Sequence, residues 1–211
     1  MSRQETLVLF TRYPIVGKNK TRLIPALGPE GATELHRQMT QSIVTRLQAC
    51  QRINRFDLAI CYTGGTLELM QAWLSSCDCF SRQVGDDLGS RMRSALINHH
   101  RQGRPVCLMG TDCPDISCSI IEEAFSALAT CDLVLGPSYD GGYYLIGCNP
   151  LLNKDVISAL FSGISWGGPD VLATTQKKIA LAGKTCHLLP ILHDIDTPED
   201  LQHLGYYPST Q

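Results

Sequence analysis

The stretch GTDCPDIS, residues 110–117, lies between an apolar run and a predicted helix. The run before it, PVCLM at 105–109, is short and apolar enough to form a buried strand, and Ser119 and Glu122 have the spacing of a capping box for the helix. Asp112 is therefore expected at the carboxyl end of a strand, where open α/β sheets bind their ligands. A carboxylate there suits Mg²⁺ or Mn²⁺ bound to a diphosphate, and the alternative is that Asp112 only caps the turn.

Apolar runs alternate with helical patterns on both sides of this stretch. TLVLF at 6–10 is continuous rather than alternating, which predicts a central parallel strand. A helix is predicted over 29–50, and further strands are predicted at 56–62 and 131–136. The alternation predicts an α/β fold.

Composition favours small-molecule chemistry. The chain has 211 residues, 44% of them hydrophobic and 18% charged, with a formal net charge of −2, which argues against a broad nucleic-acid-binding face. The sequence contains no linker, so residues 1–211 are expected to form one domain. It also contains no apolar run of the roughly 20 residues that span a membrane. The N-terminus lacks the pattern of a signal peptide, and a cytoplasmic location is expected.

The ten cysteines are scattered without paired metal-ligand spacing. We expect reduced and mostly buried thiols, as in most cytosolic proteins. Cys113 is the exception to watch, because it neighbours Asp112 and would be reactive if it were exposed.

A basic loop at 11–23 follows the first predicted strand. Phosphates are commonly held at that end of such sheets, so Lys20 and Arg22 are candidates for neutralising a phosphate group. The spacing of a Walker loop is absent, and the alternative is a solvated basic loop.

Two glycine-rich segments have both a structural and a ligand-binding interpretation. In GDDLGSRM at 85–92, Asp87 and Arg91 could contact a ligand and Gly89 could admit it to the backbone, or the segment could simply start a helix. In the second, Asp140 precedes two glycines, which is a hairpin signal that also leaves room for an acceptor bound by Asp140.

The last motif, DIDTPEDL at 194–201, contains a helix start with Thr197 as its cap. In an extended segment Asp194 and Asp196 point the same way, and Asp196 is the better placed as a second metal ligand. A further helix is expected to begin near 165–170, with Pro169 in its first turn.

Five ordered motifs together carry a family resemblance. They are KTRL at 20–23 with Phe10 and Gly17 before it, GDDLGSRM at 85–92, GTDCP at 110–114, DGGYYLIG at 140–147 and DIDTPEDL at 194–201. The set resembles a bacterial family of small GT-A-type glycosyltransferases, sometimes linked to arsenosugar or selenium gene clusters. It is more distantly similar to phospholactate guanylyltransferases and to molybdopterin and CMP-sugar nucleotidyltransferases. The chain departs from the family pattern at Arg12, where lysine is usual, and at 166–168, where Trp-Gly-Gly replaces Trp-Ser-Thr.

The resemblance implies a nucleotide-diphospho-sugar transferase fold, GT-A and Rossmann-like, with a mixed, mostly parallel sheet flanked by helices. It implies that Asp112 and Asp196 hold Mg²⁺ or Mn²⁺, that Lys20 and Arg22 bind phosphate, and that Asp140 orients or deprotonates the acceptor. Substrate contacts are expected from a further set of residues: Phe10, Arg12, Gly17, Asp87, Gly89, Arg91, Thr111, Gly141 and Gly142.

Three functions follow from this set. The first is transfer of a sugar from a nucleotide-diphospho-sugar to a small-molecule acceptor. The second is coupling of an NTP to a phosphorylated small molecule with release of pyrophosphate, which uses the same electrostatics. The third is a nucleotide-binding module without catalysis, against which the retained charged residues argue. No nucleic-acid partner is expected, and a homodimer is among the expectations for assembly.

Overall fold

The computed structural model describes residues 5–54, 56–77, 79–100 and 104–205. Its centre is one seven-stranded sheet with the strand order β3-β2-β1-β4-β6-β5-β7. The strands are β1 (Glu5–Arg12), β2 (Phe56–Thr63), β3 (Cys79–Arg82), β4 (Val106–Met109), β5 (Leu133–Pro137), β6 (Tyr143–Cys148) and β7 (Cys186–Leu188).

Strand β1 is the axis of the sheet, with β2 on one side and β4 on the other, both parallel to it. The chain moves outward from β1 in one direction to β2 and β3, then returns to the other side with β4, so the strand order reverses at β1. Of the strands in the described residues, only β6 runs antiparallel to its neighbours, β4 and β5. The predicted mixed, mostly parallel sheet flanked by helices is confirmed.

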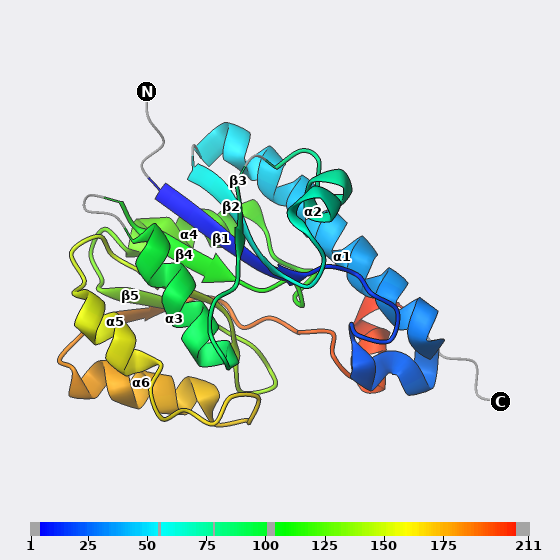
Figure 1. Cartoon of the computed structure of the whole chain (residues 1–211). Helices are drawn as coiled ribbons and strands as arrows, with labels where there is room; N and C mark the ends of the chain where they lie inside the picture. Colours follow the sequence, from blue (N-terminus) through cyan, green and yellow to red (C-terminus); the bar gives the residue numbers. More distant parts are fainter. Residues whose placement is uncertain (1–4, 55, 78, 101–103, 206–211) are drawn as a thin grey trace.

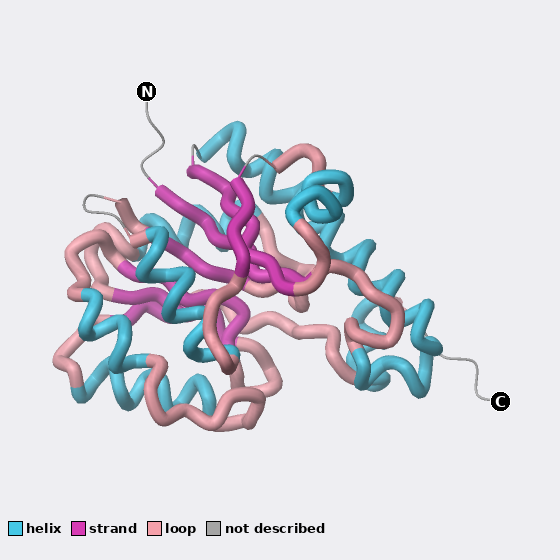
Figure 2. The backbone as a smooth tube through the Cα atoms, viewed as in Figure 1, coloured by secondary structure: helices cyan, strands magenta, loops and turns pink. Residues whose placement is uncertain are grey.

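Helices cover both faces of the sheet (Figures 1 and 2). The helices are α1 (Ile24–Asn54), α2 (Leu67–Trp73), α3 (Leu88–His99), α4 (Cys118–Ala127), α5 (Lys154–Leu160) and α6 (Val171–Leu181), with the 3-10 turns η1 (Thr21–Leu23) and η2 (Pro198–Leu204). Side chains of α1, α2 and α4 form one buried cluster with the sheet, and those of α3, α5 and α6 form another on the opposite face.

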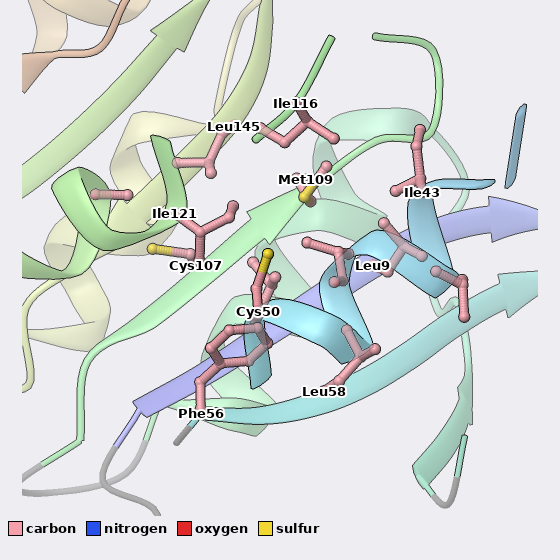
Figure 3. Close-up of a cluster of buried hydrophobic side chains, with 14 of the residues drawn as sticks. Leu9, Ile43, Cys50, Phe56, Leu58, Cys107, Met109, Ile116, Ile121 and Leu145 are labelled. Carbon is pink, nitrogen blue, oxygen red and sulfur yellow. The ribbon is translucent and has the colours of Figure 1, made fainter. Parts of the chain in front are cut away.

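Figure 3 shows the first cluster, whose packing explains why the apolar runs form central strands. Leu9 and Met109 point from β1 and β4 toward Ile43 of α1 and Ile121 of α4, and all four are buried. Strands covered on both faces need apolar residues at every position, which is why TLVLF shows no alternation.

A small third cluster ties the end of the chain to its beginning. Leu23, Met39, Ile195 and Leu201 pack together, so that η2 lies against the start of α1. In Figure 1 the red C-terminal turn accordingly lies beside the blue loop that follows β1. This packing brings the DIDTPEDL segment to the carboxyl end of the sheet.

Two predicted helices begin within one residue of the expected position, but the cap predicted for one and the first-turn residue predicted for the other are wrong. Helix α4 begins at Cys118, and its cap is Ser117, whose hydroxyl accepts a hydrogen bond from the Ile120 N–H at 3.4 Å, rather than Ser119. Helix α6 begins at Val171, so Pro169 precedes the helix instead of lying in its first turn. In both cases a second residue with capping or starting preference stood close by, and local spacing could not separate them.

The expectation that the thiols are reduced is wrong for one pair. Cys50 of α1 and Cys118 of α4 form a disulfide, with Cα atoms 5.3 Å apart and a sequence separation of 68. Sequence spacing could not reveal this pair, because the packing of α1 against α4 brings it together. Cys113 is buried, and burial followed by the charge of Asp112 raises the pKa of its thiol, so it lacks the exposure a reactive cysteine needs.

Among the residues described, no helix combines the length and the apolar character needed to cross a lipid bilayer.

Candidate functional site

The candidate site lies where β1 and β4 end, at the point where the strand order reverses. The loop that follows β1 is fixed by its own hydrogen bonds: Arg12 donates to the Lys18 carbonyl at 2.9 Å, and the Ile15 N–H donates to the Asn19 side chain at 2.8 Å. Gly17 has a φ of 75° in the turn of this loop. Lys20, at the end of the loop, also has a positive φ, of 47°, as the residue before η1.

Lys20 lies at the centre of the charged and polar groups of the site. Its side chain is only 3% exposed, and its ammonium group donates to the Asp112 carboxylate and to the Ile195 carbonyl. Asp112 and Ile195 therefore share one cation, although they lie 92 and 175 positions from Lys20 in the sequence.

The DIDTPEDL segment forms the remaining edge of the site. The Ile195 N–H donates to the Asp112 carbonyl at 2.9 Å, which fixes the segment beside the Asp112 turn. Arg22 and Asp196 form an ion pair at 2.8 Å on the exposed side. The predicted convergence of the basic loop, the Asp112 turn and the DIDTPEDL segment is present in the structure.

The carboxylates of the site differ in their electrostatic surroundings. Desolvation raises the pKa of Asp112, but the charge and the hydrogen bond of Lys20 lower it further, so the net pKa lies below its ordinary value. Burial, followed by the nearby charges of Asp140, Asp200 and Asp112, raises the pKa of Asp194. Asp194 therefore belongs to a group of mutually repelling carboxylates, whereas Asp196 is neutralised by Arg22.

Two cavities meet at Asp112. The first, here called the basic cavity, has a volume of about 550 Å³ and extends over the ends of β1 and β4. Seven of the predicted site residues line it: Phe10, Arg12, Lys20, Arg91, Thr111, Asp112 and Asp196. Lys18 adds a further cation, so four basic side chains surround this space.

The second, here called the acidic cavity, has a volume of about 210 Å³ and lies between the Asp112 turn, the β5–β6 hairpin and the segment before α6. Three aspartates line it, Asp112, Asp140 and Asp194, together with the rings of Tyr143 and Trp166. Gly142, one of the predicted substrate contacts, is also in its wall. Of the residues that the structure describes, no lysine, arginine or histidine lines this cavity.

The remaining predicted residues lie outside both cavities. Asp87 caps α3 by accepting a hydrogen bond from the Ser90 N–H at 2.6 Å, and Arg22 stands at the rim. A Cβ atom on Gly89 would lie 2.1 Å from Trp166, and one on Gly141 would lie 2.0 Å from the Pro169 carbonyl. Gly89 and Gly141 therefore make room for Trp166 and Pro169 of the protein itself, and Gly17 lies in a turn.

Several wall residues carried no sequence signal of their own. His36 of α1 lines the basic cavity, and its ring bonds the Arg12 carbonyl at 2.8 Å. Burial lowers the pKa of His36. Gln83 also lines this cavity and donates to the carbonyls of Thr11 and Cys61 at the strand ends. A helix histidine and a loop glutamine are ordinary structural residues until the fold brings them to the same cavity.

The residues at Asp112 fit a divalent cation that is shared with a phosphate-bearing ligand. The Lys20 ammonium already lies between two oxygens, the Asp112 carboxylate and the Ile195 carbonyl, which marks this spot as favourable for positive charge. Among the residues described, no cluster of three histidine, cysteine or acidic ligands could hold a metal alone. Mg²⁺ is commonly bound by one or two carboxylates and completed by substrate phosphates, so this donor set is adequate.

The sheet and its helices define the nucleotide-diphospho-sugar transferase fold. The crystal structure of a candidate nucleotide-diphospho-sugar transferase from Desulfovibrio desulfuricans is similar with a TM-score of 0.85 and 37% identity, over 97% of this chain and 87% of that chain. Residues 46–168 match the model of a family described as "Uncharacterized protein conserved in bacteria (DUF2064)". The chain belongs to the DUF2064 family.

More distant structures share the fold alone. An inositol-1-phosphate CTP transferase from T. maritima is similar with a TM-score of 0.54 and 15% identity, over 95% of this chain and 92% of that one. Glucosyl-3-phosphoglycerate synthase from Mycobacterium tuberculosis, in complex with Mg²⁺ and UDP, has a TM-score of 0.58 and 13% identity, over 96% of this chain and 74% of that one. No curated protein sequence matches the chain significantly. The fold is therefore shared by sugar and nucleotidyl transferases, and the link to arsenosugar or selenium gene clusters stays a prediction.

Proposed function

We propose that this protein is a metal-dependent glycosyltransferase that uses a nucleotide-diphospho-sugar donor and a small-molecule acceptor. The observation that best supports the proposal is the convergence of Lys20, Asp112 and the 194–196 segment on the basic cavity. Cationic side chains around a space of about 550 Å³ suit a nucleotide with its two phosphates. The 37% identical structure described as a candidate transferase for such sugars favours the same donor.

Asp112 and Asp196 are the proposed ligands of Mg²⁺ or Mn²⁺. The metal, when bound, would neutralise the diphosphate and make the nucleoside diphosphate a better leaving group. Arg22, which pairs with Asp196, would then be available to a phosphate oxygen. Lys20 would offset the remaining charge on the diphosphate from its buried position.

The acceptor is proposed to enter from the acidic cavity, next to Asp140. Its hydroxyl oxygen forms a bond to the anomeric carbon, the bond from that carbon to the diphosphate oxygen breaks, and the electron pair leaves with the nucleoside diphosphate. The hydroxyl proton passes to Asp140, whose carboxylate is fixed by the Gly142 N–H at 2.9 Å.

Nucleotidyl transfer is the second candidate, because nucleotidyltransferases share the fold. In that reaction an acceptor phosphate attacks the α-phosphorus of an NTP, and pyrophosphate leaves. A nucleotide-binding module without catalysis is the third candidate. A cytoplasmic location and a homodimer also stay predictions.

Product analysis separates the three candidates. The protein is incubated with Mg²⁺ or Mn²⁺ and with panels of nucleotide sugars, NTPs and acceptors, and released nucleoside diphosphate and pyrophosphate are measured. Release of nucleoside diphosphate supports the proposal, pyrophosphate supports the second candidate, and nucleotide binding without release supports the third.

Asp112→Asn tests the metal assignment. We expect it to lower kcat by about 100-fold or more, because the cation loses its carboxylate ligand. Asp115→Asn is the matched control, since Asp115 is an exposed aspartate of the same loop outside both cavities. Undiminished turnover in Asp112→Asn, or equal losses in the two variants, would contradict the assignment.

A further inference from the structure

The acidic cavity differs from the basic cavity in charge, and the contrast bears on the acceptor. Among the residues that line the basic cavity are Arg12, Lys18, Lys20 and Arg91. Within the described part of the chain, every charged residue in the wall of the acidic cavity is an aspartate. The two spaces share Asp112, so a donor in one and an acceptor in the other would meet at that residue.

The walls of the acidic cavity are held in place. Asp140 Oδ1 accepts hydrogen bonds from the Ser138 hydroxyl and from the Gly142 N–H. The Trp166 ring stacks on Phe161 with centroids 5.8 Å apart and meets the Tyr143 ring edge-on at 6.4 Å. The indole edge at Nε1 packs against Gly89, where no side chain would fit. The cavity therefore presents a carboxylate and an aromatic ring in a defined arrangement.

These groups recognise hydroxyl groups on an apolar frame. Carboxylates accept hydrogen bonds from hydroxyl donors, and aromatic rings pack against C–H surfaces. Lys20 offsets the charge of Asp112, but a phosphate or carboxylate in the same space would also face Asp140 and Asp194, with no cation among the described wall residues to balance them. The volume of about 210 Å³ lies below the roughly 300–1,000 Å³ of typical ligand pockets, so the part of the acceptor that it holds is small.

We propose that the acidic cavity is the acceptor subsite and that it selects an uncharged, polyhydroxylated molecule over its phosphorylated counterpart. This inference rests on the proposed function, because it takes the donor to occupy the basic cavity. It favours a hydroxyl nucleophile and therefore sugar transfer, since the nucleotidyl alternative needs a phosphate in the acidic cavity.

Matched pairs of acceptors test the selection. Glucose and glucose 6-phosphate, and inositol and inositol 1-phosphate, are titrated into the full-length protein loaded with UDP or CTP and Mg²⁺, and binding is followed by ligand-observed NMR. We expect the uncharged member of at least one pair to bind at least about tenfold more tightly, since like charges repel the phosphorylated member. Tighter binding of the phosphorylated members, or binding of neither member in both pairs, would overturn the proposal.

Charge variants link the selection to this cavity. Asp140→Lys places a cation in the wall and is expected to reverse the preference toward the phosphorylated member, whereas Asp140→Asn should reduce the preference several-fold. Asp170→Asn is the control, because Asp170 is exposed, lines neither cavity and makes no side-chain cap bond. Thermal unfolding of each variant checks that it is folded, and an unchanged preference in folded Asp140→Lys would refute the assignment.

Nucleotide titration without an acceptor separates the two proposals. If UDP and CTP fail to bind in the presence of Mg²⁺, the proposed function fails and the acceptor inference fails with it. If a nucleotide binds but the phosphorylated acceptors are preferred, only the acceptor inference fails.

Discussion

At the scale of single residues, the pairing of Lys20 with Asp112 is the most informative contact. Lys20 is almost fully buried, whereas 54% of the Asp112 side chain is exposed. In the proposed function, the buried ammonium would exchange its half-exposed carboxylate partner for a substrate phosphate without leaving its position. The contact holds the loop, and in the proposed function it would also keep a cation ready at the basic cavity.

Lys20→Met tests this contact through protein stability, without an activity assay. We expect it to lower the free energy of unfolding by about 1–2 kcal/mol at neutral pH, less than for a fully buried pair because Asp112 is partly solvated. Lys20 holds the pKa of Asp112 below its ordinary value, so the stabilisation is present above the unfolded pKa of Asp112 and is lost as the pH falls through the folded one. Denaturant unfolding from acidic to neutral pH, with exposed Lys177→Met as the control, measures it. Equal stability of Lys20→Met and the wild-type protein at neutral pH would contradict this account.

Some of the site residues could be predicted because their signals are local. Asp112 follows a short apolar run, and TPED at 197–200, directly after Asp196, is a helix-capping pattern. Both segments could therefore be predicted from neighbouring residues alone. The roles of Gly89 and Gly141 were not readable, since Trp166 and Pro169 reach them only through the fold. Likewise, sequence could not show that Arg22 neutralises Asp196 while Asp194 joins the other carboxylates.

At the scale of elements, α1 and α4 support the Asp112 turn from behind. Arg46 of α1 donates to the Ile116 carbonyl at 2.7 Å and also to the Pro114 carbonyl. One helical turn further along α1, Cys50 is bonded to Cys118 at the start of α4. The backbone that presents Asp112 is thus anchored by hydrogen bonds and by a covalent link.

Loss of the disulfide should be measurable as lost stability. With a sequence separation of 68 between the cysteines, chain-entropy arguments give a loss of about 4 kcal/mol in the free energy of unfolding for the Cys50→Ala/Cys118→Ala double variant. Denaturant unfolding with and without reductant measures it, and reductant should destabilise the wild-type protein but not the double variant. Cys79→Ser is the control, because Cys79 is an exposed cysteine outside the disulfide. Identical unfolding of the wild-type protein with and without reductant would rule out a stabilising disulfide.

The elements themselves could be largely predicted, and their arrangement could not. Continuous apolar runs identified β1, β2 and β5, since strands buried on both faces need such runs. The insertion of β6 between β4 and β5 depends on pairing between strands separated by tens of residues, which no local pattern encodes. Family resemblance supplied the mixed sheet that periodicity alone left open.

At the scale of the whole molecule, the fold separates charge into two adjoining cavities. The loop after β1 brings cations to one side of Asp112, and the β5–β6 hairpin with the late segment brings carboxylates to the other. Strand order decides this separation, because β1 and β4 are neighbours and β6 lies directly beyond them. The basic cavity, proposed to bind a nucleotide diphosphate, and the acidic cavity, proposed to bind an acceptor, are consequences of the same topology.

The most direct test of the central claim is a crystal structure of the protein with Mn²⁺ and a nucleoside diphosphate. The account predicts an anomalous Mn²⁺ peak within coordination distance of the Asp112 carboxylate and of an aspartate of the 194–196 segment, with the diphosphate near Lys20 in the basic cavity. A nucleotide or Mn²⁺ bound elsewhere, with Lys20 and Asp112 still paired and contacting neither, would contradict it.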